Sequence, residues 1–273
     1  MDELPGRHQE DHYESDYDYR SESPHLKHRH LYEFLMSRVG ATAFDAAEQT
    51  GQPHVLEVGA GDGAVTERLL ALGCEVTGTE MSRHSVEMMR ARFGSNERFE
   101  STYDPGGDLT PLGDRRFDLI LFASVLHHIP DYLNAIDRAV ENHLRPGGAL
   151  ISVQDPLWYP RMPKHTLRIT SGSYLTWRVS RGKFIRGLKT RMRRRLHGLS
   201  EEAPGDAVEY HVVRQGVDEE AVAESLRPRF ESVETLPYWS SQGKPQQRLG
   251  ERLGLANTFA LFAKGHHPAD RAD

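Results

Sequence analysis

The chain has 273 residues and a formal net charge of −6 at pH 7, from 34 lysines and arginines against 40 aspartates and glutamates, which disfavours nucleic acid as a partner of the whole molecule. No apolar run approaches the roughly 20 residues of a membrane-spanning helix, and the first residues lack the apolar core of a signal peptide. A single cysteine, Cys74, excludes an internal disulfide, so we expect a cytoplasmic protein.

Two segments precede the first predicted strand. Residues 1–23 carry eight acidic residues against two arginines, and we expect either a flexible segment or a lid that its tyrosines help to form. Residues 24–50 have apolar side chains at helical spacing, which predicts a helical segment. Its three histidines, His25, His28 and His30, have no nearby cysteine or paired carboxylate that would complete a metal site. We therefore expect no metal, and histidines that face solvent or substrate.

Residues 51–155 alternate between predicted strands and predicted helices. The strands are expected near residues 54–58, 75–79, 97–101, 117–123 and 148–154. Such alternation implies a parallel sheet with helices on both faces, an α/β fold.

The turn after the first of these strands contains three glycines, in the sequence EVGAGDG over residues 57–63. Glycines let the backbone turn sharply and approach a ligand, and α/β proteins seat nucleotide-like cofactors at such a strand–turn–helix unit. The spacing of these glycines also satisfies the sequence fingerprint of dinucleotide-binding proteins, which has an acid about 20 residues further on, here Glu80. Glu80 does not discriminate, because an acid there binds ribose hydroxyls in either case. Glu57 favours a cationic group, since its carboxylate would repel a pyrophosphate.

Two later segments distinguish these alternatives. Residues 117–131 read FDLILFASVLHHIPD, and residues 144–155 read LRPGGALISVQD. With the glycine turn, this pair resembles class I S-adenosylmethionine-dependent methyltransferases of the small-molecule and natural-product type. The resemblance is strong over about 50–155 and weaker over about 216–264. The Tyr-x-x-x-Lys pair of a short-chain dehydrogenase does not occur, so a nicotinamide enzyme is the less favoured alternative.

The resemblance implies a Rossmann-like fold with a seven-stranded, mostly parallel sheet. The core would occupy residues 51–155, and residues 156–215 would form a helical cap over the substrate. Residues 216–265 would supply a helix, with Asp218 at its start, and two closing strands. The last residues, 266–273, would be a loose tail.

The resemblance also implies the cofactor, S-adenosylmethionine, and its contacts. Glu57 would face the amino group, Glu80 the ribose hydroxyls, and Met81 the adenine. Asp104 and Asp108 compete for the adenine amino group, and we prefer Asp104 because it directly follows the third strand. The cofactor-binding residues are thus Glu57, Gly59, Gly61, Asp62, Gly63, Glu80, Met81, Asp104 and Ala123.

Methyl transfer from a sulfonium needs a base only when the nucleophile must lose a proton, as a hydroxyl does. His127 and His128 follow the fourth predicted strand and Asp155 follows the fifth, an arrangement similar to sugar and natural-product O-methyltransferases. The alternative is that the two histidines only shape the loop. We expect O-methylation of a small-molecule acceptor, a sugar-containing or secondary metabolite. Methylation of nitrogen or of a lipid-linked acceptor, and a non-catalytic binding protein, remain alternatives.

The predicted cap contains a strongly basic stretch. Residues 178–195 hold nine lysines and arginines and no acid, and apolar residues recur there every fourth position. This pattern is typical of a cap helix with a solvated cationic face, of a helix in peripheral contact with a membrane, or of a site for an anionic acceptor. The oligomeric state is left open.

Overall fold

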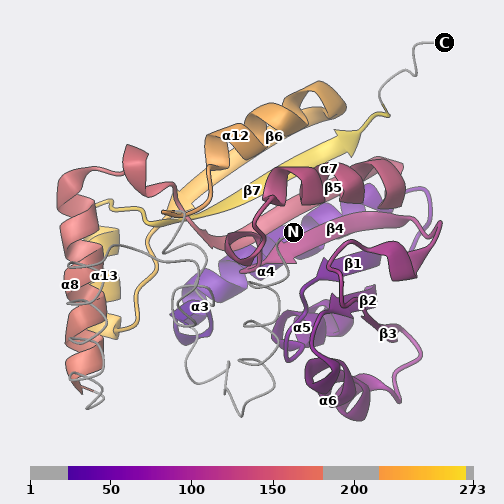
Figure 1. Cartoon of the computed structure of the whole chain (residues 1–273), viewed down its shortest axis with the longest axis horizontal. Coiled ribbons are helices and arrows are strands. Elements are labelled where there is room, and N and C mark those ends of the chain that lie inside the picture. The colour runs from indigo at the N-terminus through magenta and orange to yellow at the C-terminus, as the bar shows by residue number, and fades with distance from the viewer. Residues whose placement is uncertain (1–23, 181–214, 269–273) are drawn as a thin grey trace.

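The computed structural model describes residues 24–180 and 215–268 (Figure 1). The acidic segment 1–23, most of the basic stretch 178–195 and the end of the tail lie outside these residues, so our expectations for them are not tested. Within the described residues, no helix is long and apolar enough to cross a membrane.

A single seven-stranded sheet runs through the molecule in the order β3-β2-β1-β4-β5-β7-β6. The strands are β1 (His54–Val58), β2 (Glu75–Glu80), β3 (Phe99–Tyr103), β4 (Phe117–Ala123), β5 (Leu144–Pro156), β6 (Phe230–Tyr238) and β7 (Thr258–His266). The first five pair in parallel, whereas β7 pairs antiparallel with both β5 and β6. The predicted seven-stranded, mostly parallel sheet with two closing strands is therefore confirmed.

Helices cover both faces of the sheet, as predicted. One face carries α4 (Arg29–Ala46), α5 (Ala64–Leu72) and α6 (Arg83–Phe93), and the other carries α7 (Tyr132–His143) and α12 (Glu219–Leu226). The remaining helices are α3 (Pro24–Lys27), α8 (Lys164–Ser180) and α13 (Lys244–Arg252), with short 3-10 turns η1 (Thr110–Leu112), η2 (Leu126–His128), η3 (Tyr159–Arg161) and η4 (Arg227–Arg229). The strands between the two helical layers are apolar because both of their faces are buried.

Local signals fix several boundaries. The Asp131 carboxylate accepts the Asn134 N–H at the start of α7, and the Asp218 carboxylate accepts the Ala221 N–H at the start of α12. Both caps satisfy N–H groups that have no partner within the helix. The third strand begins two residues later than predicted, because the carbonyl of Asn96 accepts the Phe99 N–H and closes a turn there.

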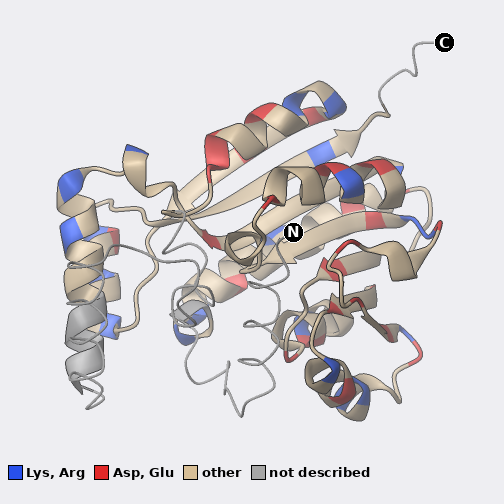
Figure 2. Cartoon of the chain, in the orientation of Figure 1, with Lys and Arg blue, Asp and Glu red and all other residues tan. Residues whose placement is uncertain are grey.

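Figure 2 shows that lysines, arginines, aspartates and glutamates lie mainly on the helices and loops, and that few lie on the central strands. The acidic exceptions are informative. Asp118 lies at the amino end of β4, where both of its oxygens accept from Arg145. Glu57, Glu80 and Asp155 instead lie at the carboxyl ends of β1, β2 and β5. That edge is where open α/β sheets bind ligands.

Candidate functional site

The glycine turn has the backbone geometry that its sequence predicts. Gly59, Gly61 and Gly63 have φ values of 67°, 58° and 76°, the left-handed region that favours glycine. A Cβ on Gly59 would lie 2.5 Å from Val125, and one on Gly63 would lie 2.5 Å from Phe93. A Cβ on Gly61 would meet nothing within 4 Å. Two glycines are thus required by packing, while the middle one faces open space.

Glu80 is held rigidly at the end of β2. Its Oε2 accepts the Gly61 N–H at 2.9 Å, and its Oε1 accepts the N–H groups of Met81 and Ser82 at 2.8 and 3.2 Å. Burial raises the pKa of Glu80, and these N–H groups counteract part of that rise. Oε1 has both lone pairs in use, whereas Oε2 keeps one for a further donor, so the carboxylate is positioned to accept from a ligand hydroxyl.

Glu57 lies deeper, 2% exposed, beneath the glycine turn. Its Oε2 accepts a hydrogen bond from the Thr66 hydroxyl. Burial raises the pKa of Glu57 to about 8, and the Thr66 bond lowers it only in part. A cation beside this carboxylate would stabilise the ionised form, which burial otherwise disfavours.

The structure separates the two candidate aspartates after β3. Asp104 is buried, and its Oδ2 accepts the Leu109 N–H at 2.9 Å. Its Oδ1 is buried and has no hydrogen-bond partner within the described parts of the chain. Asp108 is exposed and caps the Thr110 N–H instead. Of these two aspartates, Asp104 is therefore the one with a buried oxygen that no group in the described residues donates to.

A histidine and an aspartate meet beyond the ends of β4 and β5. His127 Nδ1 lies 2.7 Å from Asp155 Oδ1, and the His127 backbone N–H donates to the same oxygen at 3.2 Å. The Ser152 hydroxyl donates to Asp155 Oδ2 at 3.0 Å. Asp155 is fully buried, and the His127 side chain is 10% exposed. Because a carboxylate only accepts, Nδ1 carries the proton and the basic lone pair of the neutral ring lies on Nε2.

A bulge in β5 makes this contact possible. Residues three apart on a regular strand face opposite sides, yet Ser152 and Asp155 bond to each other. The pairing with β7 shifts register between Val153 and Asp155, and Gln154 has a φ of 70°. The extra residue turns Asp155 to the face of Ser152, as bulges beside active sites commonly re-aim a side chain. Ser124, after β4, also has a left-handed φ of 58°.

The comparisons with known proteins agree with this geometry. Residues 56–150 match the family model described as a methyltransferase domain. This segment, about a third of the chain, is thus similar to a methyltransferase domain. A ubiquinone biosynthesis O-methyltransferase from Xanthomonas campestris is 33% identical over 98 residues, which are 36% of this chain and 41% of that protein. The chain spans less than half the length of the curated relatives it matches.

Solved structures support the methyltransferase fold along nearly the whole chain. The N-methyltransferase NodS from Bradyrhizobium japonicum, in complex with S-adenosyl-L-homocysteine, has a TM-score of 0.53 at 18% identity, covering 96% of this chain and 98% of that one. The plantazolicin methyltransferase BpumL, also with S-adenosylhomocysteine, has a TM-score of 0.51 at 14% identity, covering 97% and 96%. At such identities, these matches establish the fold alone.

The residues of the methyltransferase domain fit S-adenosylmethionine, its cofactor. The unused Oδ1 of Asp104 suits an amino group, Glu80 suits hydroxyls, and the buried acid of Glu57 suits an ammonium. The open space at Gly61 leaves room beside them. The predicted roles of Asp62, Met81 and Ala123 stay predictions. Asp62 caps the Ala64 N–H, Met81 is half-buried, and Ala123 ends β4.

His128, the third predicted catalytic residue, lies beside His127, with ring centroids 4.0 Å apart and ring planes tilted by 45°. Its backbone N–H donates to the Val125 carbonyl within η2. His128 thus packs against the ring of His127, and the structure places His127, not His128, on the Asp155 carboxylate.

Several residues of the site could not be predicted from the sequence. Thr66 donates to Glu57, and Ser152 donates to Asp155. In the sequence, these two hydroxyl residues are marked only by their distance from the acids that they orient. Tyr32 reaches from α4 to the glycine turn, where its hydroxyl donates to the Ala64 carbonyl at 3.3 Å. Burial and the nearby Glu57 raise the pKa of Tyr32 to about 12, so its hydroxyl stays neutral.

The prediction for the N-terminal histidines is wrong for His28. It is buried, and its Nε2 lies 2.7 Å from the Ser241 carbonyl oxygen. Burial lowers its pKa, which favours the neutral ring. His30 contacts Glu251 on the same side. These contacts fasten the start of α4 to the segment between β6 and β7. In the described residues, no group of three or more histidine, cysteine, aspartate or glutamate side chains could hold a metal ion.

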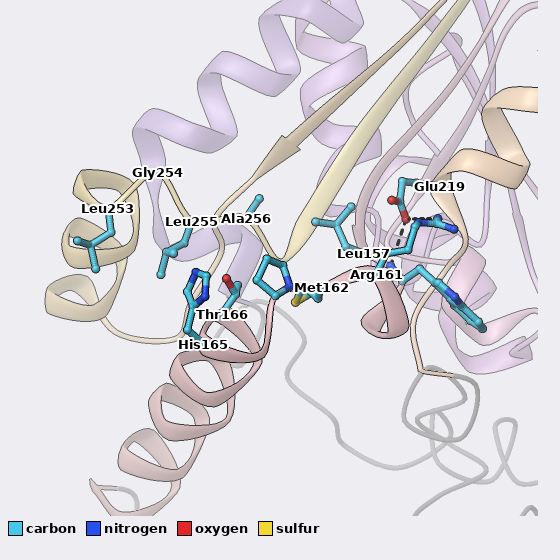
Figure 3. Close-up of a pocket in the computed structure, with 12 residues that line it drawn as sticks. Leu157, Arg161, Met162, His165, Thr166, Glu219, Leu253, Gly254, Leu255 and Ala256 are labelled. Atoms are coloured by element: carbon cyan, nitrogen blue, oxygen red, sulfur yellow. Dashed lines mark hydrogen bonds and ion pairs between the residues drawn. The ribbon is translucent and has the colours of Figure 1, made fainter.

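A hollow lies where the chain leaves β5 for the predicted cap (Figure 3). It has a cavity volume of about 320 Å³. His165 and Thr166, from the first turn of α8, face Leu255 and Ala256 across it. At its other end, Arg161 pairs with Glu219 at 3.2 Å. This ion pair, with the bridge between Leu157 and Val217, ties the first residues of the insertion to the residues that follow it.

Proposed function

We propose that the chain transfers a methyl group from S-adenosylmethionine to a hydroxyl oxygen of a small-molecule acceptor. The contact between His127 and Asp155 carries this proposal. It lies at the carboxyl ends of β4 and β5, beside the glycine turn that begins the cofactor site. A base at that place serves an acceptor that must lose a proton. A hydroxyl must lose its proton to become a good nucleophile, whereas a neutral amine can attack without losing one.

The chemistry divides between binding and proton removal. When bound, S-adenosylmethionine supplies an electrophilic methyl group and a neutral thioether leaving group. Glu57, Glu80 and Asp104 hold it, and positioning of the two reactants contributes up to about 7–11 kcal/mol. His127 Nε2 takes the proton from the acceptor hydroxyl, while Asp155 keeps the ring in the Nδ1–H tautomer. The Asp155 carboxylate also stabilises the imidazolium that forms.

The acceptor is a small molecule that contains a sugar or derives from secondary metabolism. The 33% identity to a ubiquinone biosynthesis O-methyltransferase supports transfer to oxygen. Peripheral membrane contact through residues 178–195 stays a prediction, because most of that stretch lies outside the described residues.

The test compares hydroxyl and amine acceptors of matched shape with methyl-labelled S-adenosylmethionine. We expect methylation of a hydroxyl acceptor, and we expect His127→Gln to abolish most of it without weakening S-adenosylhomocysteine binding. Methylation of the amine members alone, or hydroxyl turnover unchanged in His127→Gln, would refute the assignment to oxygen.

A further inference from the structure

Gln154 is a buried amide with an unused donor. The residue is 2% exposed, and its Nε2 is buried without a hydrogen-bond partner anywhere in residues 24–180 and 215–268. Burying an amide N–H without a partner costs free energy, so native proteins seldom keep one without a reason. The left-handed φ of this non-glycine residue adds to that cost.

Another buried glutamine in the chain shows the usual outcome. Gln247 is 1% exposed, and its Nε2 donates to the Trp239 carbonyl at 2.6 Å. Its Oε1 accepts the Ser241 N–H at 2.8 Å. Both ends of that amide are satisfied by the fold itself. Gln154 differs because its Nε2 has no partner among the residues that the structure describes.

The position of Gln154 indicates what that group is. It directly precedes Asp155 on β5, and the Ser124 N–H after β4 donates to the carbonyl of its neighbour Val153 at 2.8 Å. In the sheet, β4 lies between β5 and β1, whose glycine turn begins the cofactor site. Gln154 therefore lies two strands from the strand that the cofactor turn follows, on the strand that carries the proposed base partner.

We propose that Gln154 binds the methyl acceptor by donating from Nε2 to an oxygen other than the one that is methylated. This inference rests on the proposed function. A donor on the reacting oxygen would engage the lone pair that must attack the methyl group, so the partner is a neighbouring oxygen. The acceptor class is thus a molecule with two adjacent oxygens, such as a vicinal diol or a hydroxy-carbonyl compound. Because the amide is neutral, the neighbouring oxygen needs a free lone pair but no negative charge.

The test uses Gln154→Met, which removes the amide while keeping an unbranched side chain of similar size. Gln247→Met is the matched control, because it removes an amide that the fold uses. Without ligand, we expect the melting temperature of Gln154→Met to equal or exceed that of the wild type, and that of Gln247→Met to fall. A fall in Gln154→Met as large as in the control would mean that the fold uses the amide, and would overturn the proposal.

The second arm measures methyl transfer to catechol against phenol, and to cis-1,2-cyclohexanediol against cyclohexanol. We expect the wild type to favour a two-oxygen member by about tenfold or more in kcat/KM, and Gln154→Met to lose that preference. No preference in the wild type in either pair, or a preference that survives in Gln154→Met, overturns the proposal.

A third arm separates this inference from the proposed function. Calorimetry with S-adenosylhomocysteine should give wild-type affinity for Gln154→Met. Weakened binding would place the amide on the cofactor and overturn the proposal while leaving methyl transfer intact. Failure of the wild type itself to bind S-adenosylhomocysteine would refute the proposed function, and this inference with it.

Discussion

Replacement of Asp155 by asparagine tests how the His127 base is controlled. Two donors of His127, the backbone N–H and Nδ1–H, converge on Asp155 Oδ1, while the Ser152 hydroxyl contacts Oδ2. An asparagine at this position places its amide oxygen towards His127, because its NH₂ group would oppose two donors there. The Ser152 hydroxyl rotates to accept from the NH₂ group. The Nδ1–H tautomer therefore survives in Asp155→Asn, and only the negative charge is lost.

The expected magnitude follows from that geometry. A hydrogen bond to a charged group contributes about 1.5–3 kcal/mol, against about 1 kcal/mol for a neutral bond. Losing the charge should thus raise the barrier by about 1–2 kcal/mol, or lower turnover roughly 5- to 30-fold. His127→Gln removes the base altogether and should cost about 10²–10⁴-fold. Ser152→Ala, the mildest change, should cost only a few-fold, since it removes one neutral donor.

The assay is kcat for transfer of labelled methyl to a hydroxyl acceptor, with S-adenosylhomocysteine affinity measured in each variant. We expect losses in the order His127→Gln, Asp155→Asn, Ser152→Ala, and cofactor affinity near that of the wild type throughout. An Asp155→Asn variant as damaged as His127→Gln would show that the asparagine sits with its NH₂ towards the ring. That result would refute the argument from the two converging donors.

Three further outcomes concern the cofactor site. Because burial raises the pKa of Glu57 to about 8, its carboxyl group is protonated at pH 7 without ligand, and binding of the ammonium group should release that proton. Calorimetry in buffers of different ionisation enthalpy measures the release. A binding enthalpy that does not depend on the buffer would contradict this prediction. Because the pKa of Glu57 is higher in the folded than in the unfolded chain, the stability that protonated Glu57 contributes declines as pH rises from about 4.5 towards 8. Glu57→Gln should flatten the fall of melting temperature with pH over this range. An unchanged dependence of melting temperature on pH would contradict this prediction. Gly61→Ala should fold with a modest loss of stability but bind S-adenosylhomocysteine weakly. Gly59→Ala should lower the melting temperature more, because its Cβ would lie 2.5 Å from Val125. Equal losses of melting temperature in the two variants would contradict this difference in packing.

The sequence predicted the features that local chemistry determines. The glycine turn, the apolar strands and the caps at Asp131 and Asp218 each arise from short-range backbone geometry or hydrogen bonding. The acids near the carboxyl ends of β1, β2 and β5 were visible because buried strands seldom contain charged residues.

Features that depend on distant partners were not predicted. His28 looked like a solvated histidine, since its partner Ser241 lies 213 residues away. The bulge at Gln154 arises from pairing between β5 and β7, and nothing in the sequence around Asp155 signals a left-handed glutamine. The helix α13 was missed for a related reason, because its buried side chains, such as Gln247, are polar and satisfied by tertiary bonds.

The central claim is that this edge of the sheet binds S-adenosylmethionine and not a dinucleotide. Calorimetry of the purified chain with S-adenosylhomocysteine, and with NAD in parallel, tests it most directly. We predict binding of S-adenosylhomocysteine at micromolar affinity and no heat from NAD, because the buried acid of Glu57 can ionise beside an ammonium group, whereas a pyrophosphate offers it no cation. Binding of NAD without binding of S-adenosylhomocysteine would contradict the account.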